Sequence, residues 1–196
     1  VLSQPELLDK FNLPLSVIPK IRQSWENRLN QLITSRFDFS MSEKGLKVYE
    51  YNCDSASCYM EAGKVQGKWA DHYHIKDGDD AGKGLFSELA RAWRKSNAKG
   101  LVHILRDDEP EEKYHALFMQ QTLKRAGIET RIIVGLEGLL WDEAGDIKDD
   151  DGNKVEWVWK TWSWETALDQ IREECDEDNE QRSVYEPRWK LGKPLR

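Results

Sequence analysis

The spacing of hydrophobic residues changes after the N-terminal part of the chain. Apolar residues first recur every three or four positions, which predicts a short helix over Pro5–Lys10 and a longer one from Pro14 to about Ile33. Apolar and polar residues then alternate, which predicts two strands, Arg36–Ser40 and Leu46–Asn52. A loop over Glu43–Gly45, with Gly45 in the left-handed conformation, would join these strands into a hairpin.

The predicted hairpin loop fixes which residues face each other. It pairs Ser42 with Leu46, so Asp38 lies opposite Glu50, and Arg36 lies opposite Asn52 on the same face. Two carboxylates in such a pair destabilise a hairpin unless a cation neutralises them or water solvates both. A register shifted by one residue would separate them. The other face carries the aromatic residues that we expect in the core: Phe37, Phe39, Tyr49 and Tyr51.

The remaining pattern predicts an α/β fold, a mixed sheet with β-hairpins and a βαβ unit flanked by helices. The βαβ unit has strands at Gly100–Leu105 and Thr130–Val134, with a helix between them that ends at Gly127, and it implies parallel strands with a right-handed crossover. The other predicted elements are a helix over Ser57–Tyr73 with Cys58, Ala62, Val65 and Trp69 inward, a helix over Asp79–Lys95 with Leu85, Leu89 and Trp93 inward, a hairpin over Leu139–Trp162 turning at Asp151–Asn153, and a helix from Glu165 to about Glu177.

Composition narrows the possible functions. The chain has 196 residues, 39% hydrophobic and 33% charged, which is typical of a soluble globular protein. Its net charge of −7 argues against a nucleic-acid surface, whereas an acidic cleft would suit a cation. Three cysteines suggest a reducing, cytoplasmic compartment, and no apolar run reaches membrane length. The four histidines show no HExxH or other metal-ligand spacing, so we expect them on the surface or in the core.

Candidate chemistry gathers on the polar face of the first hairpin. Arg36, Asp38, Glu50 and Asn52 share this face, and the turn Asp54–Ser57 leads from it into a helix. Hard oxygen ligands suit Mg²⁺, and the free N–H groups of a helix start suit a carboxylate or phosphate. An ordinary hairpin followed by a hydroxyl-capped helix remains an open alternative.

Four long motifs resemble those of glutathionylspermidine synthetases and of the trypanothione synthetases of kinetoplastids. They are Lys47–Cys58 (KVYEYNCDSASC), Val102–Met119, Trp157–Thr166 and Asp169–Glu173, and the resemblance runs from about Leu7 to about Asp178. It implies an ATP-grasp-like ligase that uses ATP and Mg²⁺ to activate the glycine carboxylate of glutathione as an acyl phosphate. An amine of a polyamine, either spermidine or glutathionylspermidine, would then attack it.

The resemblance also implies roles for individual residues. Arg36 would lie beside the ATP phosphates and the acyl phosphate, and Asp38 would bind the metal at the nucleotide. The Mg²⁺ ligands would be Asp38, Glu50 and Asn52; the glutathione contacts would be Ser55, Ser57 and Thr166; and Glu111 and Glu112 would lie near glutathione and the polyamine. Cys58 would either form a mixed disulfide with glutathione or be a simple packed cysteine.

The resemblance weakens after Asn179. The motif Val184–Trp189 arrives earlier than in the family, which suggests a deletion and divides the chain into a partial ligase domain, residues 1–178, and a truncated tail, residues 179–196. The family's ATP-holding lysines and glycine-rich loop have no counterpart here. We therefore expect an incomplete and inactive portion of the ligase, such as a fragment or degenerate copy. The alternative is a non-catalytic module that binds glutathione or pairs with a partner.

Overall fold

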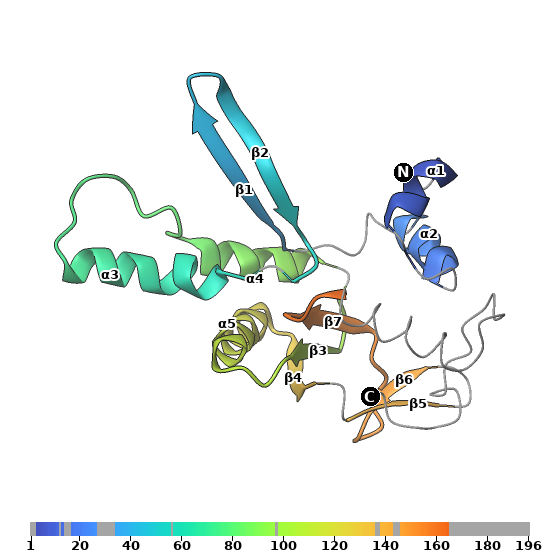
Figure 1. Ribbon diagram of the computed structural model, residues 1–196. Coiled ribbons are helices and arrows are strands. Elements are labelled where there is room, and N and C mark those ends of the chain that lie inside the picture. The colour runs from blue at the N-terminus through green and yellow to red at the C-terminus, as the bar shows by residue number, and fades with distance from the viewer. Residues whose placement is uncertain are drawn as a thin grey trace.

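A three-stranded parallel sheet in the order β4–β3–β7 lies at the centre of the molecule (Figure 1). The computed structural model describes residues 3–11, 13, 17–26, 34–55, 57–96, 98–135, 138–142 and 146–164. The sheet consists of β3 (Leu101–Arg106), β4 (Glu129–Val134) and β7 (Trp157–Lys160), and helix α5 (Pro110–Ala126) connects the first two strands. The predicted α/β class and the parallel βαβ unit are confirmed.

The main core lies between this sheet and two helices. Strand β3 is buried from Val102 to Leu105, and α5 packs against β3 and β4. Helix α4 (Leu85–Lys95) packs on α5, with Leu89 and Trp93 buried as predicted. The Trp93 Nε1–H donates to the Met119 sulfur at 3.1 Å, so the polar edge of this buried indole is satisfied.

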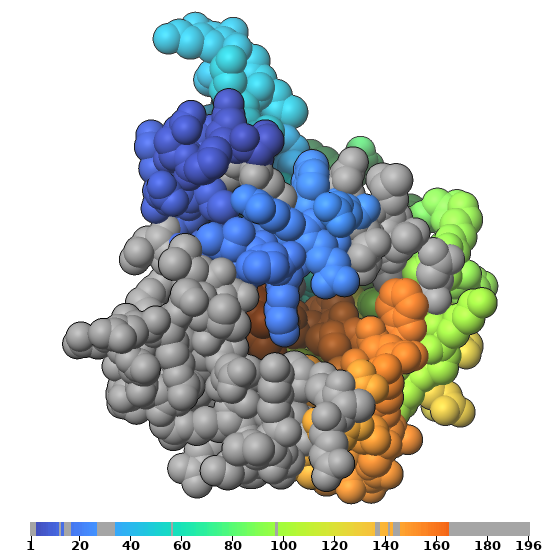
Figure 2. Space-filling model, turned by 90° about the vertical axis from the view of Figure 1, so that its right-hand side faces the viewer, coloured from blue at the N-terminus to red at the C-terminus, as the bar shows by residue number. Residues whose placement is uncertain are grey.

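The first hairpin projects from the rest of the molecule (Figures 1 and 2). Strands β1 (Arg36–Ser42) and β2 (Gly45–Asn52) pair Asp38 with Glu50 and Arg36 with Asn52, as predicted. Gly45 has the predicted positive φ, but Ser42 pairs with Gly45 and the turn has two residues. The register shifts by one residue between Asp38 and Phe39, and the predicted pairs therefore still form at the base of the hairpin.

The aromatic face of this hairpin contradicts our core prediction. Phe37, Phe39, Tyr49 and Tyr51 are 48%, 51%, 80% and 47% exposed. Phe37 stacks on Phe39 and Tyr51 within the hairpin, with ring centroids 5.9 and 4.3 Å apart. Alternation identified a two-faced hairpin correctly, but it cannot show whether another layer covers the apolar face.

The helix after the serine-rich turn also differs from the prediction. It begins at Tyr59, continues as the π-helical turn η4 (Glu61–Val65) and ends as α3 (Gln66–His72). Val65 and Trp69, predicted to face inward, are 44% and 56% exposed. Instead, Gly63 faces Phe118 and Leu85, so the irregular turn brings a glycine to the core side.

The segment over Leu139–Trp162 forms a shorter hairpin than predicted. Strands β5 (Leu139–Trp141) and β6 (Ile147–Asp149) pair with each other, while β7 joins β3 in the parallel sheet. Gly152 lies in a turn as predicted, and this turn brings Asn153–Val155 back along β6, with an isolated bridge between Lys148 and Lys154. The single long hairpin was therefore wrong, because β7 is stabilised by pairing with a distant strand.

The N-terminal elements are α1 (Pro5–Leu8), the 3₁₀ turn η1 (Asp9–Phe11) and α2 (Ile18–Glu26). Helices α1 and α2 lie within the two predicted helices, and η1 extends one residue beyond the first, to Phe11. Parts of the second predicted helix, the predicted helix from Glu165 and the predicted tail lie outside the described residues. No helix in the described part of the chain is both long and apolar enough to cross a membrane.

Candidate active site

Arg36 joins the two facing carboxylates at the base of the hairpin. Its Nε and Nη2 both lie 3.1 Å from Asp38 Oδ2, and Nη2 lies 3.7 Å from Glu50 Oε1. The hydrogen bond with Asp38 raises the pKa of Arg36 above its usual value. The structure therefore brings together three of the predicted site residues, and the guanidinium offsets the repulsion between the carboxylates.

Arg36 also connects the strands to the serine-rich turn. Its Nη1 donates to Ser57 Oγ at 3.2 Å and lies 4.0 Å from Cys58 Sγ. Asn52 Oδ1 accepts from the backbone N–H groups of Asp54 and Ser55, at 3.3 and 3.2 Å. Asn52 thus shapes the turn, while Arg36 orients one of its hydroxyls.

Lys160 at the end of β7 anchors the same turn, which the sequence analysis missed. Its Nζ pairs with the Asp54 carboxylate and donates to the Asp54 carbonyl at 3.1 Å, and the Trp164 N–H donates to the same carboxylate at 2.8 Å. Burial lowers the pKa of Lys160, although Asp54 opposes this shift. Lys160 also lies 4.8 and 5.2 Å from the Trp162 and Trp164 rings. The motif Trp157–Thr166 contained this residue, but its partner is 106 positions away.

The donor set at the hairpin base fits a hard divalent cation in part. Both Arg36 bonds to Asp38 involve Oδ2, and no described residue bonds to Oδ1. Glu50 is half exposed, so its carboxylate can also reach a ligand. Asn52 Oδ1 already accepts two N–H groups. Asp38 and Glu50 are thus the better placed Mg²⁺ donors, and binding by Asn52 would weaken its contacts with the turn.

The remaining predicted site residues lie elsewhere or outside the described region. Glu111 and Glu112 begin α5, and no described contact joins them to Arg36. The helix that follows Cys58 approaches Glu111 through His115, because Glu61 and Glu111 each lie 3.6 Å from His115 Nε2. Cys58 is an exposed free thiol, so the packed-cysteine alternative was wrong. Thr166 is outside the described residues.

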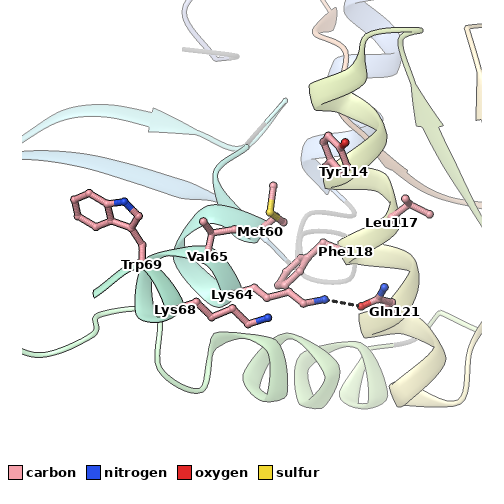
Figure 3. Close-up of a pocket in the computed structure, with 9 residues that line it drawn as sticks. All are labelled: Met60, Lys64, Val65, Lys68, Trp69, Tyr114, Leu117, Phe118 and Gln121. Atoms are coloured by element: carbon pink, nitrogen blue, oxygen red, sulfur yellow. Dashed lines mark hydrogen bonds between the residues drawn. The ribbon is translucent and has the colours of Figure 1, made fainter. Parts of the chain in front are cut away.

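An apolar groove runs between α5 and the helix formed by η4 and α3 (Figure 3). Its volume is about 530 Å³. The lining residues are Met60, Lys64, Val65, Lys68, Trp69, Tyr114, Leu117, Phe118 and Gln121. Lys64 Nζ donates to Gln121 Oε1 at 3.2 Å across the groove. None of the predicted site residues lines this groove.

Comparison with known proteins relates this arrangement to a family. The family model described as "Glutathionylspermidine synthase preATP-grasp" matches residues 1–192. The chain belongs to this glutathionylspermidine synthase family. The match includes both the hairpin base and the serine-rich turn.

Curated members of the glutathionylspermidine synthase family align with most of the chain. It is 51% identical over 178 residues to the bifunctional glutathionylspermidine synthetase/amidase of Escherichia coli (strain K12), with 91% of the chain and 29% of that protein covered. It is 37% identical over 172 residues to the trypanothione synthetase of Crithidia fasciculata, with 86% of the chain and 26% of that protein covered. The chain thus spans less than a third of each of these relatives.

Proposed function

We propose that this chain forms the metal-binding and glutathione-binding side of an ATP- and Mg²⁺-dependent amide ligase. The reaction would join the glycine carboxylate of glutathione to an amine of a polyamine, spermidine or glutathionylspermidine, through an acyl phosphate. The supporting observation is the convergence of Arg36, Asp38, Glu50 and Ser57 at the hairpin base. The names of the two relatives, a glutathionylspermidine synthetase/amidase and a trypanothione synthetase, support this proposal.

The proposed residue roles follow from charge and position. Bound MgATP would supply the phosphoryl group. Asp38 and Glu50 would hold the metal ion, with Asn52 as a third oxygen donor, and Arg36 would offset negative charge on the reacting oxygens. Arg36 needs no proton transfer to do this, because it stays charged throughout the physiological range.

Glutathione would lie along the turn that follows β2. Ser57 offers a hydroxyl already oriented by Arg36, and Ser55 lies in a turn whose backbone is held by Asn52. Thr166, Glu111 and Glu112 complete the proposed contacts to glutathione and the polyamine. The exposed thiol of Cys58, 3.7 Å from Ser57 Oγ, could attack oxidised glutathione (the disulfide), which would form a mixed disulfide and release one molecule of reduced glutathione. The two described cysteines, Cys53 and Cys58, are free, which accords with a cytoplasmic location.

Calorimetry with glutathione tests this proposal on the full 196-residue chain. We expect weak binding of glutathione that strengthens when Mg²⁺ is present, and no ATP turnover in the presence of glutathione and spermidine. We expect binding because of the geometry of the site. We expect no turnover because, among the described residues, Arg36 is the single cation at the two carboxylates. Absence of binding at millimolar glutathione would contradict the site, and turnover would contradict the proposed need for further ligase residues.

A further inference from the structure

A second group of potential metal ligands joins η4 to the start of α5. Glu61, Glu111 and His115 each point one ligand atom into a region where these atoms lie within 4.8 Å of one another. His115 is 2% exposed, and neither of its ring nitrogens has a hydrogen-bond partner among the described residues. A buried imidazole without partners is costly, so its position between two carboxylates calls for a ligand.

The two distances from His115 fit a shared ion better than direct hydrogen bonds. His115 Nε2 lies 3.6 Å from Glu61 Oε1 and 3.6 Å from Glu111 Oε1. A direct bond between a protonated histidine and a carboxylate measures about 2.7–2.9 Å. Two donors bound to one tetrahedral ion at about 2.1–2.2 Å lie roughly 3.4–3.6 Å apart. Donors around an ammonium nitrogen would lie farther apart, because each hydrogen bond is about 2.8 Å long.

We propose that Glu61, Glu111 and His115 form a binding site for a divalent transition-metal ion. Imidazole together with carboxylates suits zinc and its neighbours better than Mg²⁺, which prefers oxygen ligands alone. Glu61 and Glu111 are partly exposed, which leaves a path for the ion and room for a water ligand. The ion would connect η4 to α5 directly beyond the serine-rich turn.

This site does not depend on the ligase function. The metal site and the proposed ligase site share Glu111, because the ligase proposal assigns this residue to glutathione or the polyamine. The experiment must therefore separate a metal ion from a polyamine.

Zn²⁺ titration of the full chain tests the site. Cys53, Cys58 and Cys175 are first replaced by serine, and excess Mg²⁺ is present to occupy the hairpin carboxylates. We expect one Zn²⁺ per chain and a shift of the His115 ring ¹⁵N resonances on binding. Glu61→Gln, an isosteric change at a partly exposed position, should weaken Zn²⁺ binding by at least about tenfold. Glu129→Gln, at an exposed glutamate outside the cluster, serves as the matched control and should leave Zn²⁺ affinity unchanged.

Three outcomes would overturn the proposal. Equal Zn²⁺ affinity in Glu61→Gln and the parent protein would exclude Glu61 as a ligand. His115 resonances that do not move would place the ion elsewhere. Spermidine that displaces Zn²⁺, and whose own binding is lost in Glu61→Gln, would identify the occupant as a polyamine. A chain that binds Zn²⁺ as expected but does not bind glutathione would contradict the ligase proposal and support the metal site.

Discussion

At the scale of single residues, Arg36 in the hairpin and Lys160 in the parallel sheet contact the same turn. Arg36 bonds to Ser57 Oγ, and Lys160 pairs with Asp54, so the serine-rich turn is fixed between the hairpin and the parallel sheet. A binding loop fixed in this way loses less conformational entropy when a ligand binds. Lys160 thus acts as a positioning residue for the proposed glutathione site.

Lys160→Met tests this positioning role. The substitution keeps an unbranched apolar side chain against Trp162 and Trp164 but leaves Asp54 without its cation. We expect the dissociation constant for glutathione to rise by about tenfold, because the turn must be ordered on binding. Calorimetry measures it. Lys154→Met removes a surface ion pair with Asp146 and is the matched control; an equal loss of affinity in both variants would contradict the role.

At the scale of elements, close backbone contact determines how η4 packs. The carbonyl of Ala62 in η4 approaches Gly82, in the turn before α4, so closely that a Cβ on Gly82 would overlap it. Only glycine allows this approach, so the π-helical turn and the turn before α4 depend on each other. The contact also fixes the side of η4 on which Glu61 lies.

Gly82→Ala should therefore destabilise the fold by about 3 kcal/mol, because the added Cβ would meet the backbone carbonyl of Ala62, which cannot rotate away. Urea unfolding monitored by tryptophan fluorescence measures the change. Gly138→Ala, where an added Cβ meets no atom within 4 Å, is the matched control and should change the stability by no more than about 1 kcal/mol. A Gly82→Ala protein as stable as the control would show that the backbones do not approach so closely.

A buried carboxylate connects β6 to the central sheet. Asp149 accepts from Asn153, from His103 in β3 at 3.1 Å and from Arg131 in β4 at 3.0 Å. Burial alone would raise the pKa of Asp149, but the Asn153 and His103 hydrogen bonds and the Arg131 charge outweigh it and lower the pKa to about 2. The usual value is 3.8, so the unfolded chain binds this proton more tightly than the folded one.

The free energy of unfolding should therefore fall as the pH decreases from about 4 to about 2, where protonation removes this contribution. Above pH 4 the contribution of Asp149 is fully present and independent of pH. Asp149→Asn should lower the stability at neutral pH by about 2 kcal/mol and abolish this part of the acid dependence. Denaturant unfolding of both proteins across this range measures the difference. A difference that stays constant down to pH 2 would contradict the low pKa.

At the scale of the whole molecule, local pattern predicted much of the fold. The strands and helix of the βαβ unit and the base register of the hairpin were predictable because periodicity and turn chemistry are local. Three other features depend on segments that are far apart in the sequence. They are the pairing of β7 with β3, the exposure of the aromatic hairpin face that includes Phe39, and the Asp54–Lys160 pair. The sequence analysis gave the histidines no ligand role, because it did not use the i, i+4 spacing of Glu111 and His115, and because the approach of Glu61 depends on a distant segment.

The most direct test of the proposed ligase site places this chain inside a longer relative. The segment of the Escherichia coli glutathionylspermidine synthetase/amidase that aligns with it is replaced by this chain, and ATP turnover dependent on glutathione and spermidine is measured. We expect turnover by the chimera, and a loss of at least about a hundredfold in kcat for Asp38→Ala and for Glu50→Ala, because phosphoryl charge is left uncompensated. Full turnover in both variants would contradict the assignment of these carboxylates to the metal.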